Sequence, residues 1–134
     1  MEEYEKIQDE NEQILKKFEV CFLKKGLSKG IINKHINNIR LFINDYLADD
    51  WEIRPIELDA SSLVLFLEWC IDKWIFNTSS GFVSALASIK IFYEYLNKDA
   101  NYKIKEINKI LSICDKKDYY ANKFISHERL LNQD

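Results

Sequence analysis

The chain has 134 residues, of which 47% are hydrophobic and 31% are charged, the balance of one folded domain rather than of a disordered chain. It contains only three glycines and one proline. Because the turns of sheets and sandwiches consume these residues, the composition excludes an all-β fold and a glycine-rich nucleotide-binding fold, and it favours a few long helices. The net charge of −3 lacks the basic excess that is usual for nucleic-acid-binding domains.

The cysteines and the hydrophobic runs bear on the cellular compartment. Cys21, Cys70 and Cys114 are far apart, and each lies in an apolar stretch, which predicts buried free thiols in a reducing environment. The N-terminus is acidic and lacks the apolar core of a secretory signal. The longest apolar run, residues 63–67, is too short to span a bilayer. We therefore expect a cytoplasmic protein with no membrane partner.

The first two helices are predicted from apolar residues at helical spacing. Residues 4–25 carry one stripe, interrupted only by Asn11, and Gly26 follows a basic last turn as a glycine stop. Ser28 is a natural N-cap for the next helix, whose stripe extends to Leu47.

The rest of the chain continues the same pattern. A loop containing Pro55 leads to Asp59, the predicted cap of a helix whose residues 63–76 are apolar on nearly all sides. A polar hinge, another helix ending near Leu96 and a short linker then lead to a fifth helix at residues 104–114. The pattern predicts an all-α domain over residues 1–118 and a helical or flexible tail over residues 119–134.

Charge is unevenly distributed along the chain. Residues 16–40 contain seven basic residues and one acidic residue, whereas residues 1–15 and 41–76 are strongly acidic. The net charge therefore hides a basic block, which is either an anion-binding patch or a solvated helix face.

Catalytic chemistry finds little support. His35 lies in the apolar stripe of the second helix, where a hydrogen-bonded core histidine is expected, and His127 lies in the tail. Neither histidine has a cysteine at metal-ligand spacing, and phosphate-binding loops and nucleophile motifs are absent. Glu68 and Asp72 could share a proton or bind a hard cation, but we favour a solvent-exposed helix edge. We expect no enzyme, no cofactor and no metal.

Residues 16–97 resemble a known domain in their packing pattern. A Gly-Leu-Ser turn at residues 26–28 precedes a stripe that includes His35, Ile39 and Phe42, and the last helix repeats its apolar residues at Leu86, Ile89, Phe92, Tyr93 and Leu96. The pattern is similar to the N-terminal core-binding (SAM-like) domain of the tyrosine recombinase/phage integrase family, without the catalytic domain.

The resemblance implies a four- to five-helix orthogonal bundle that forms one half of a clamp on DNA. It therefore implies a non-catalytic module that binds the DNA backbone weakly through a basic helix face. The expected DNA-binding residues are Lys24, Lys25, Ser28, Lys29, Lys34, Asn37, Ser80 and Lys90.

The alternative is a bundle reused for protein interaction or dimerisation, with little DNA affinity. Where the family has a threonine and a basic pair on the last helix, this chain has Gly81, Ser84 and Ala85. Trp69, Trp74 and the 119–131 tail would then contact a second copy or another protein, although large aromatic residues in helical stripes more often fill the bundle core.

Overall fold

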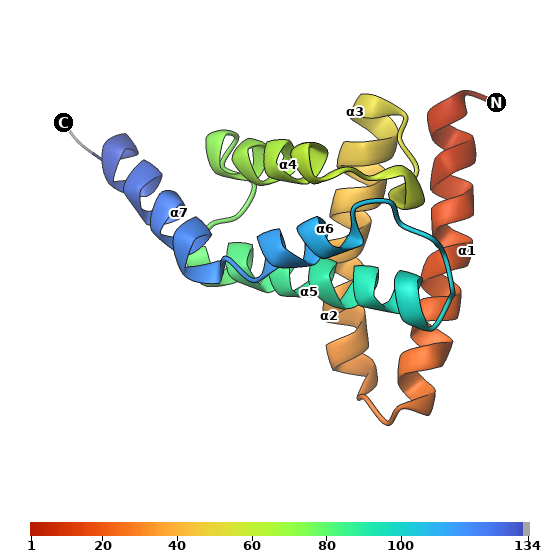
Figure 1. The fold of residues 1–134 in the computed structure, drawn as a ribbon. Helices are drawn as coiled ribbons and strands as arrows, with labels where there is room; N and C mark the ends of the chain where they lie inside the picture. Colours follow the sequence, from red (N-terminus) through yellow and green to blue (C-terminus); the bar gives the residue numbers. More distant parts are fainter. Residues whose placement is uncertain (133–134) are drawn as a thin grey trace.

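The computed structural model describes residues 1–132, and within these residues it is helical with no strand (Figure 1). The predicted all-α bundle is confirmed. Its elements are α1 (Glu3–Lys24), α2 (Lys29–Arg40), the π-helix η1 (Leu41–Ala48), α3 (Asp49–Trp51), the 3₁₀ turn η2 (Pro55–Glu57), α4 (Ala60–Asp72), α5 (Ser79–Lys98), α6 (Ile107–Cys114) and α7 (Lys117–Leu131).

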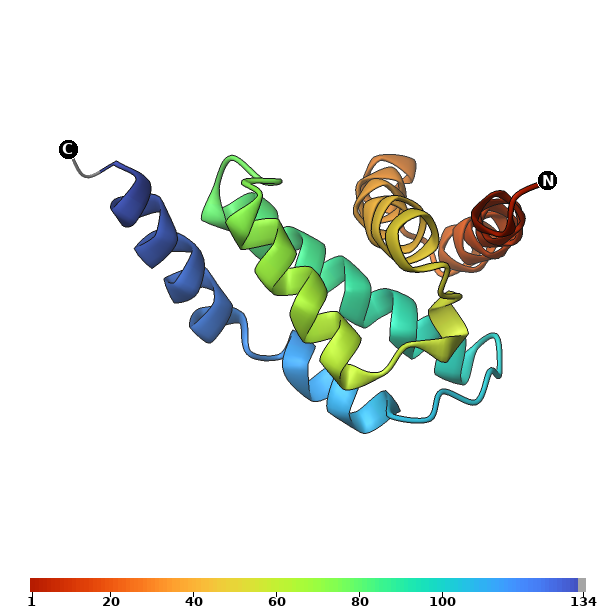
Figure 2. The same cartoon turned by 90° about the horizontal axis from the view of Figure 1, so that it is seen from above.

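The helices form two crossing groups. Elements α2, η1 and α3 follow one another without a break and make a single rod, Lys29–Trp51, that lies antiparallel to α1. Helices α4, α5 and α6 run crosswise to this pair, and α7 extends from the far end of the crosswise group (Figures 1 and 2). The corner between α1 and α2 and the helix α7 therefore lie at opposite ends of the molecule.

Several helix ends differ from the prediction. The helix predicted over residues 63–76 ends at Asp72, and α6 begins at Ile107 rather than at Ile104. Ile75, Phe76 and Ile104 are nevertheless wholly or partly buried in the loops where they lie. Apolar residues in a loop that covers the core look like helix residues in the sequence, and this explains the error. Residues 119–131 of the tail predicted as helical or flexible lie in α7, which begins at Lys117, and residues 133–134 of that tail lie outside the described residues.

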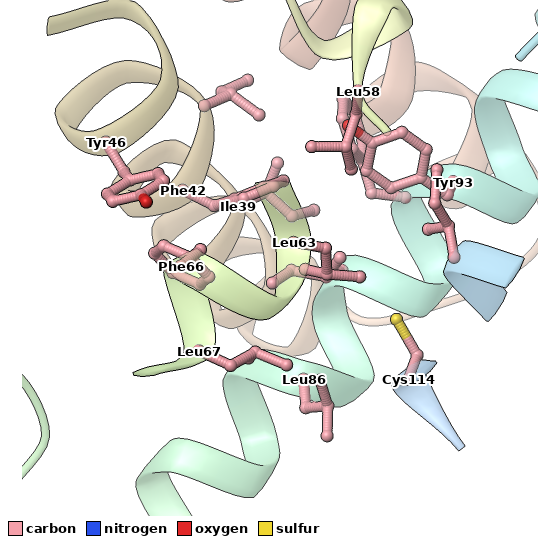
Figure 3. Packing of buried hydrophobic residues seen from close by; sticks show 14 of the residues in the cluster. Ile39, Phe42, Tyr46, Leu58, Leu63, Phe66, Leu67, Leu86, Tyr93 and Cys114 are labelled. Carbon is pink, nitrogen blue, oxygen red and sulfur yellow. The ribbon is translucent and has the colours of Figure 1, made fainter. Parts of the chain in front are cut away.

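Helix α5 lies at the centre of the core. Phe82, Leu86, Ile89, Phe92 and Tyr93 on this helix are all fully buried. The Tyr93 hydroxyl donates a hydrogen bond to the Pro55 carbonyl at 2.8 Å and so fixes the loop before α4. Cys114 of α6 packs in the same core (Figure 3), where burial raises the pKa of its thiol to about 12 and keeps it unreactive.

An aromatic cluster joins the rod to α4. The ring centroids of Phe42 and Phe66 are 4.6 Å apart, and the Tyr46 ring lies 5.1 Å from that of Phe66 (Figure 3). The Tyr46 ring also lies 5.0 Å from that of Trp69. Aromatic pairs at such distances add about 1 kcal/mol each beyond their buried area. Trp69 is half-buried in this cluster and so belongs largely to the core.

A buried polar network joins α1 to the π-helix. The Asn11 amide, which has no exposed surface, donates to the Ile43 carbonyl at 3.1 Å and to the Asn44 side-chain oxygen at 2.8 Å. Asn44 in turn donates to Glu12, which accepts two further bonds from Arg40. The polar break at Asn11 in the first helical stripe is therefore an interhelical contact.

Trp74 connects the end of α4 to α7. The chain leaves α4 through a Schellman turn, in which Ile75 N donates to the Cys70 carbonyl and Trp74 N donates to the Ile71 carbonyl. Trp74 adopts a φ of 55°, the left-handed conformation that usually requires glycine at this position. Its indole stacks on Phe124 of α7 with centroids 5.4 Å apart, and this contact holds a strained backbone in place.

Two substitutions at Trp74 separate the stacking from the strain. Trp74→Ala loses the stack and keeps the unfavourable φ, so we expect the free energy of unfolding to fall by about 2 kcal/mol. Trp74→Gly loses the same stack but relieves the backbone, so we expect it to be about 1 kcal/mol more stable than the alanine variant. Urea unfolding of the two variants measures the difference, and an alanine variant as stable as the glycine variant would contradict the assignment of strain.

Candidate nucleic-acid interface

The corner between the first two helices, residues Lys24–Lys29, is built by local sequence. Leu27 N donates to the Phe22 carbonyl and Gly26 N to the Leu23 carbonyl, which closes α1 with a Schellman turn. Gly26 takes a φ of 90°, which side chains rarely adopt. The Ser28 hydroxyl then accepts a hydrogen bond from Ile31 N and caps α2. The predicted stop and cap are both confirmed.

Four of the predicted DNA-binding residues lie at this corner. Lys24, Lys25, Ser28 and Lys29 are all exposed. Lys25 also forms an ion pair with Asp99 at 3.0 Å, which raises the pKa of the lysine and ties the corner to the end of α5. Its side chain is still about half exposed. The corner therefore concentrates positive charge on a firmly anchored turn.

The first turn of α2 also suits an anion. A helix N-terminus carries a partial positive charge and several backbone amides without helical partners. The first turn of α2 contains no acidic residue, and the position of a Cβ on Gly30 has no neighbour within 4 Å. The first turn of α2 is therefore open to a phosphate group, and Lys29 is the first residue of this helix.

The remaining predicted residues are spread over two helices. Lys34 and Asn37 lie on the exposed side of α2, about 7 and 12 Å along the axis from Lys29, since each helical residue rises about 1.5 Å. Ser80 lies in the first turn of α5. Lys90 donates to Asp115 at 2.6 Å, and this carboxylate, at the end of α6, raises the pKa of the lysine. Lys34 thus lies on the same helix as Lys29, whereas Ser80 and Lys90 lie on a different helix, α5.

Polar side chains fill the crossing of α2 and α5. The Ser88 hydroxyl donates to the Ser84 carbonyl, so it accepts from His35 Nδ1 at 2.8 Å and from the Asn38 amide at 3.0 Å. Asn38 also donates to the Ser84 hydroxyl. Ala85 is buried. The two positions where the resembled family carries a basic pair are therefore used here for packing between helices.

The basic block contains two further exposed residues that the sequence reasoning did not select. Lys16 and Lys17 lie on the outer surface of α1, and neither forms an ion pair with any residue of 1–132. The high charge of residues 16–40 was the signal that could have found them. They lie about 10–12 Å from Lys24 along the axis of α1.

Other chemistries have weaker support. Glu68 forms a long ion pair with Lys123 at 3.9 Å, and Asp72 is exposed, as expected for a solvent-facing helix edge. Across residues 1–132, no three His, Cys, Asp or Glu side chains gather in a way that could hold a metal ion. None of the helices described combines the length and hydrophobicity needed to cross a membrane.

No family model matches the chain, and comparisons with curated proteins and with solved structures likewise find no match. The similarity to the integrase core-binding domain stays a prediction.

His35 makes stability depend on pH. Burial, and to a smaller extent the nearby charge of Lys34, lower the pKa of this histidine in the folded protein. The unfolded chain therefore binds more protons as the pH falls, so stability is lost from about pH 6.5 downward and the loss levels off below the lowered pKa. Urea unfolding from pH 7.5 to pH 5 should show a larger loss for the wild type than for His35→Gln. Equal losses would show that His35 does not contribute.

Proposed function

We propose that this protein is a non-catalytic module that binds the sugar-phosphate backbone of DNA through the α1–α2 corner. The observation that carries the proposal is a group of exposed lysines on the second half of α1 and the first half of α2. They form no ion pair with residues 1–132, whereas Lys25 and Lys90 each have a carboxylate partner. The group consists of Lys16, Lys17, Lys24, Lys29 and Lys34.

The acidic residues of α1 do not cancel this charge, because arginines elsewhere hold several of them. Glu3 and Glu10 pair with Arg54 at 3.3 and 2.7 Å, and Glu12 accepts two bonds from Arg40. These pairs lie on the first half of α1, toward the end opposite the corner. Apart from Glu19, the acidic residues of α1 thus lie on its first half, and the lysines that α1 contributes to the group lie on its second half.

The chemistry of the corner favours phosphate over bases. Lysine side chains, a serine hydroxyl and helix N-terminal amides are donors that position a protein on the backbone and carry little sequence information. With about three to five phosphate contacts, binding is weak and falls steeply as salt rises, since each contact contributes about −0.9 to the slope of log K against log salt. We expect little preference among DNA sequences.

The resemblance supports part of this proposal. It agrees on the corner and on the start of α2, where Ser28, Lys29 and Lys34 match the expected pattern. It disagrees on α5, where Ser84 and Ala85 pack against α2 and the core. The proposed contact surface is therefore smaller than the family's, and it is centred on the α1–α2 corner.

Fluorescence anisotropy with a short mixed-sequence duplex tests the proposal over a range of salt. The triple variant Lys24→Gln/Lys29→Gln/Lys34→Gln should bind more weakly and lower the salt slope by about 2.7, the value for three lost phosphate contacts. A matched triple variant at Lys105, Lys116 and Lys117 removes the same charge from exposed residues outside the corner and should keep most of the affinity.

Two results would refute the proposal. One is the absence of salt-sensitive binding at micromolar protein. The other is an equal loss of affinity in the two triple variants, which would indicate a general charge effect rather than a site at the corner.

A further inference from the structure

A groove of about 460 Å³ separates α4 from α7, at the end of the molecule opposite the α1–α2 corner. We call it the α4–α7 groove. Glu68 and Asp72 form its α4 wall, and Lys123 and His127 line its α7 wall. Ile71, Tyr119 and Leu130 add apolar surface between and beside these charges. Figure 2 shows α4 and α7 running alongside each other, with α5 behind α4.

Helix α7 is only partly used by its own bundle. Tyr120 and Phe124 are buried against the core, and Phe124 stacks on Phe82 and Trp74. The last turn of the helix, in contrast, exposes Leu130 to 64% and Leu131 to 58%. Tyr119 is more than half exposed beside the groove. Exposed leucine and tyrosine side chains beside a groove with charged walls are typical of a protein interface.

The charges of the groove are arranged for self-association. Lys123 lies 3.9 Å from Glu68 across the groove, whereas Asp72 forms no ion pair with residues 1–132. A twofold axis that runs along the groove exchanges the two walls, so Asp72 on the α4 wall of one chain faces Lys123 on the α7 wall of the other. An axis across the groove would place like charges together and is disfavoured. We propose that the α4–α7 groove binds a second copy of this chain in a symmetric dimer whose twofold axis runs along the groove.

The size of the surface sets the strength of this dimer. Helix α7 has 15 residues and is about 22 Å long, and two neighbouring helices present a face about 20 Å wide. The contact is thus on the order of 440 Å² per chain, below the standard size of stable interfaces. We therefore expect a reversible dimer that forms at high protein concentration.

Charge reversal tests the pairing of the walls by sedimentation velocity at about 100 µM protein, a concentration suited to a weak interface. Lys123→Glu makes both walls acidic, and Glu68→Lys/Asp72→Lys makes both walls basic, so each variant alone should be monomeric. An equimolar mixture of the two should dimerise, because every facing pair of walls is then opposite in charge. The wild type should dimerise under the same conditions.

Leu130→Ser tests the apolar part of the groove and should weaken dimerisation about tenfold. Leu23→Ser is its matched control, because Leu23 is an exposed leucine, 43% accessible, near the opposite end of the molecule. A wild type that stays monomeric at this concentration would overturn the proposal. So would a charge-reversed mixture without dimer, or equal effects of the two leucine variants.

Discussion

The burial of α5 is the interaction on which the rest of the fold depends. Nine of its side chains are buried, and α2, α6 and α7 all pack against it. Each neighbour uses a different chemistry: polar side chains at α2, apolar residues at α6, and aromatic rings at α7. A helix enclosed on so many sides leaves little room for ligand-binding residues, and so the candidate surfaces lie at the two ends of the molecule.

The separation of these two ends has a functional meaning. The basic α1–α2 corner and the α4–α7 groove share no element, and the packed core lies between them. A dimer formed through the groove would therefore leave both corners free and far apart. Two of the proposed backbone sites on one particle would bind a long duplex much more tightly than either site alone, because the second contact becomes intramolecular. The weak binding proposed for each chain is therefore compatible with tighter binding by the proposed dimer.

The sequence predicted the parts of this fold that local chemistry decides. Gly26, Ser28 and Asp59 stop or cap helices where expected, since their roles depend only on neighbouring backbone atoms. The end of α4 could not be predicted, because Trp74 adopts the left-handed backbone conformation that usually requires glycine. This conformation is stabilised by stacking on Phe124, which lies 50 residues later in the chain. For the same reason, the carboxylate partner of Lys90 and the packing role of Ser84 were not visible in the sequence.

The π-helical stretch η1 has a consequence for changes in chain length. Its wider turns hold more residues than an α-helix would need to join α2 to α3. Losing one residue here would convert the π-helical stretch of the rod to an ordinary α-helix. The side chains of α2 and α3 at the two ends of the rod would then keep their present directions. The same loss in α5 would rotate all later residues by about 100° and move its buried side chains into solvent. A one-residue deletion in the rod thus preserves the orientation of its two ends, but six of the eight residues of η1 are buried, so the deletion also removes core contacts.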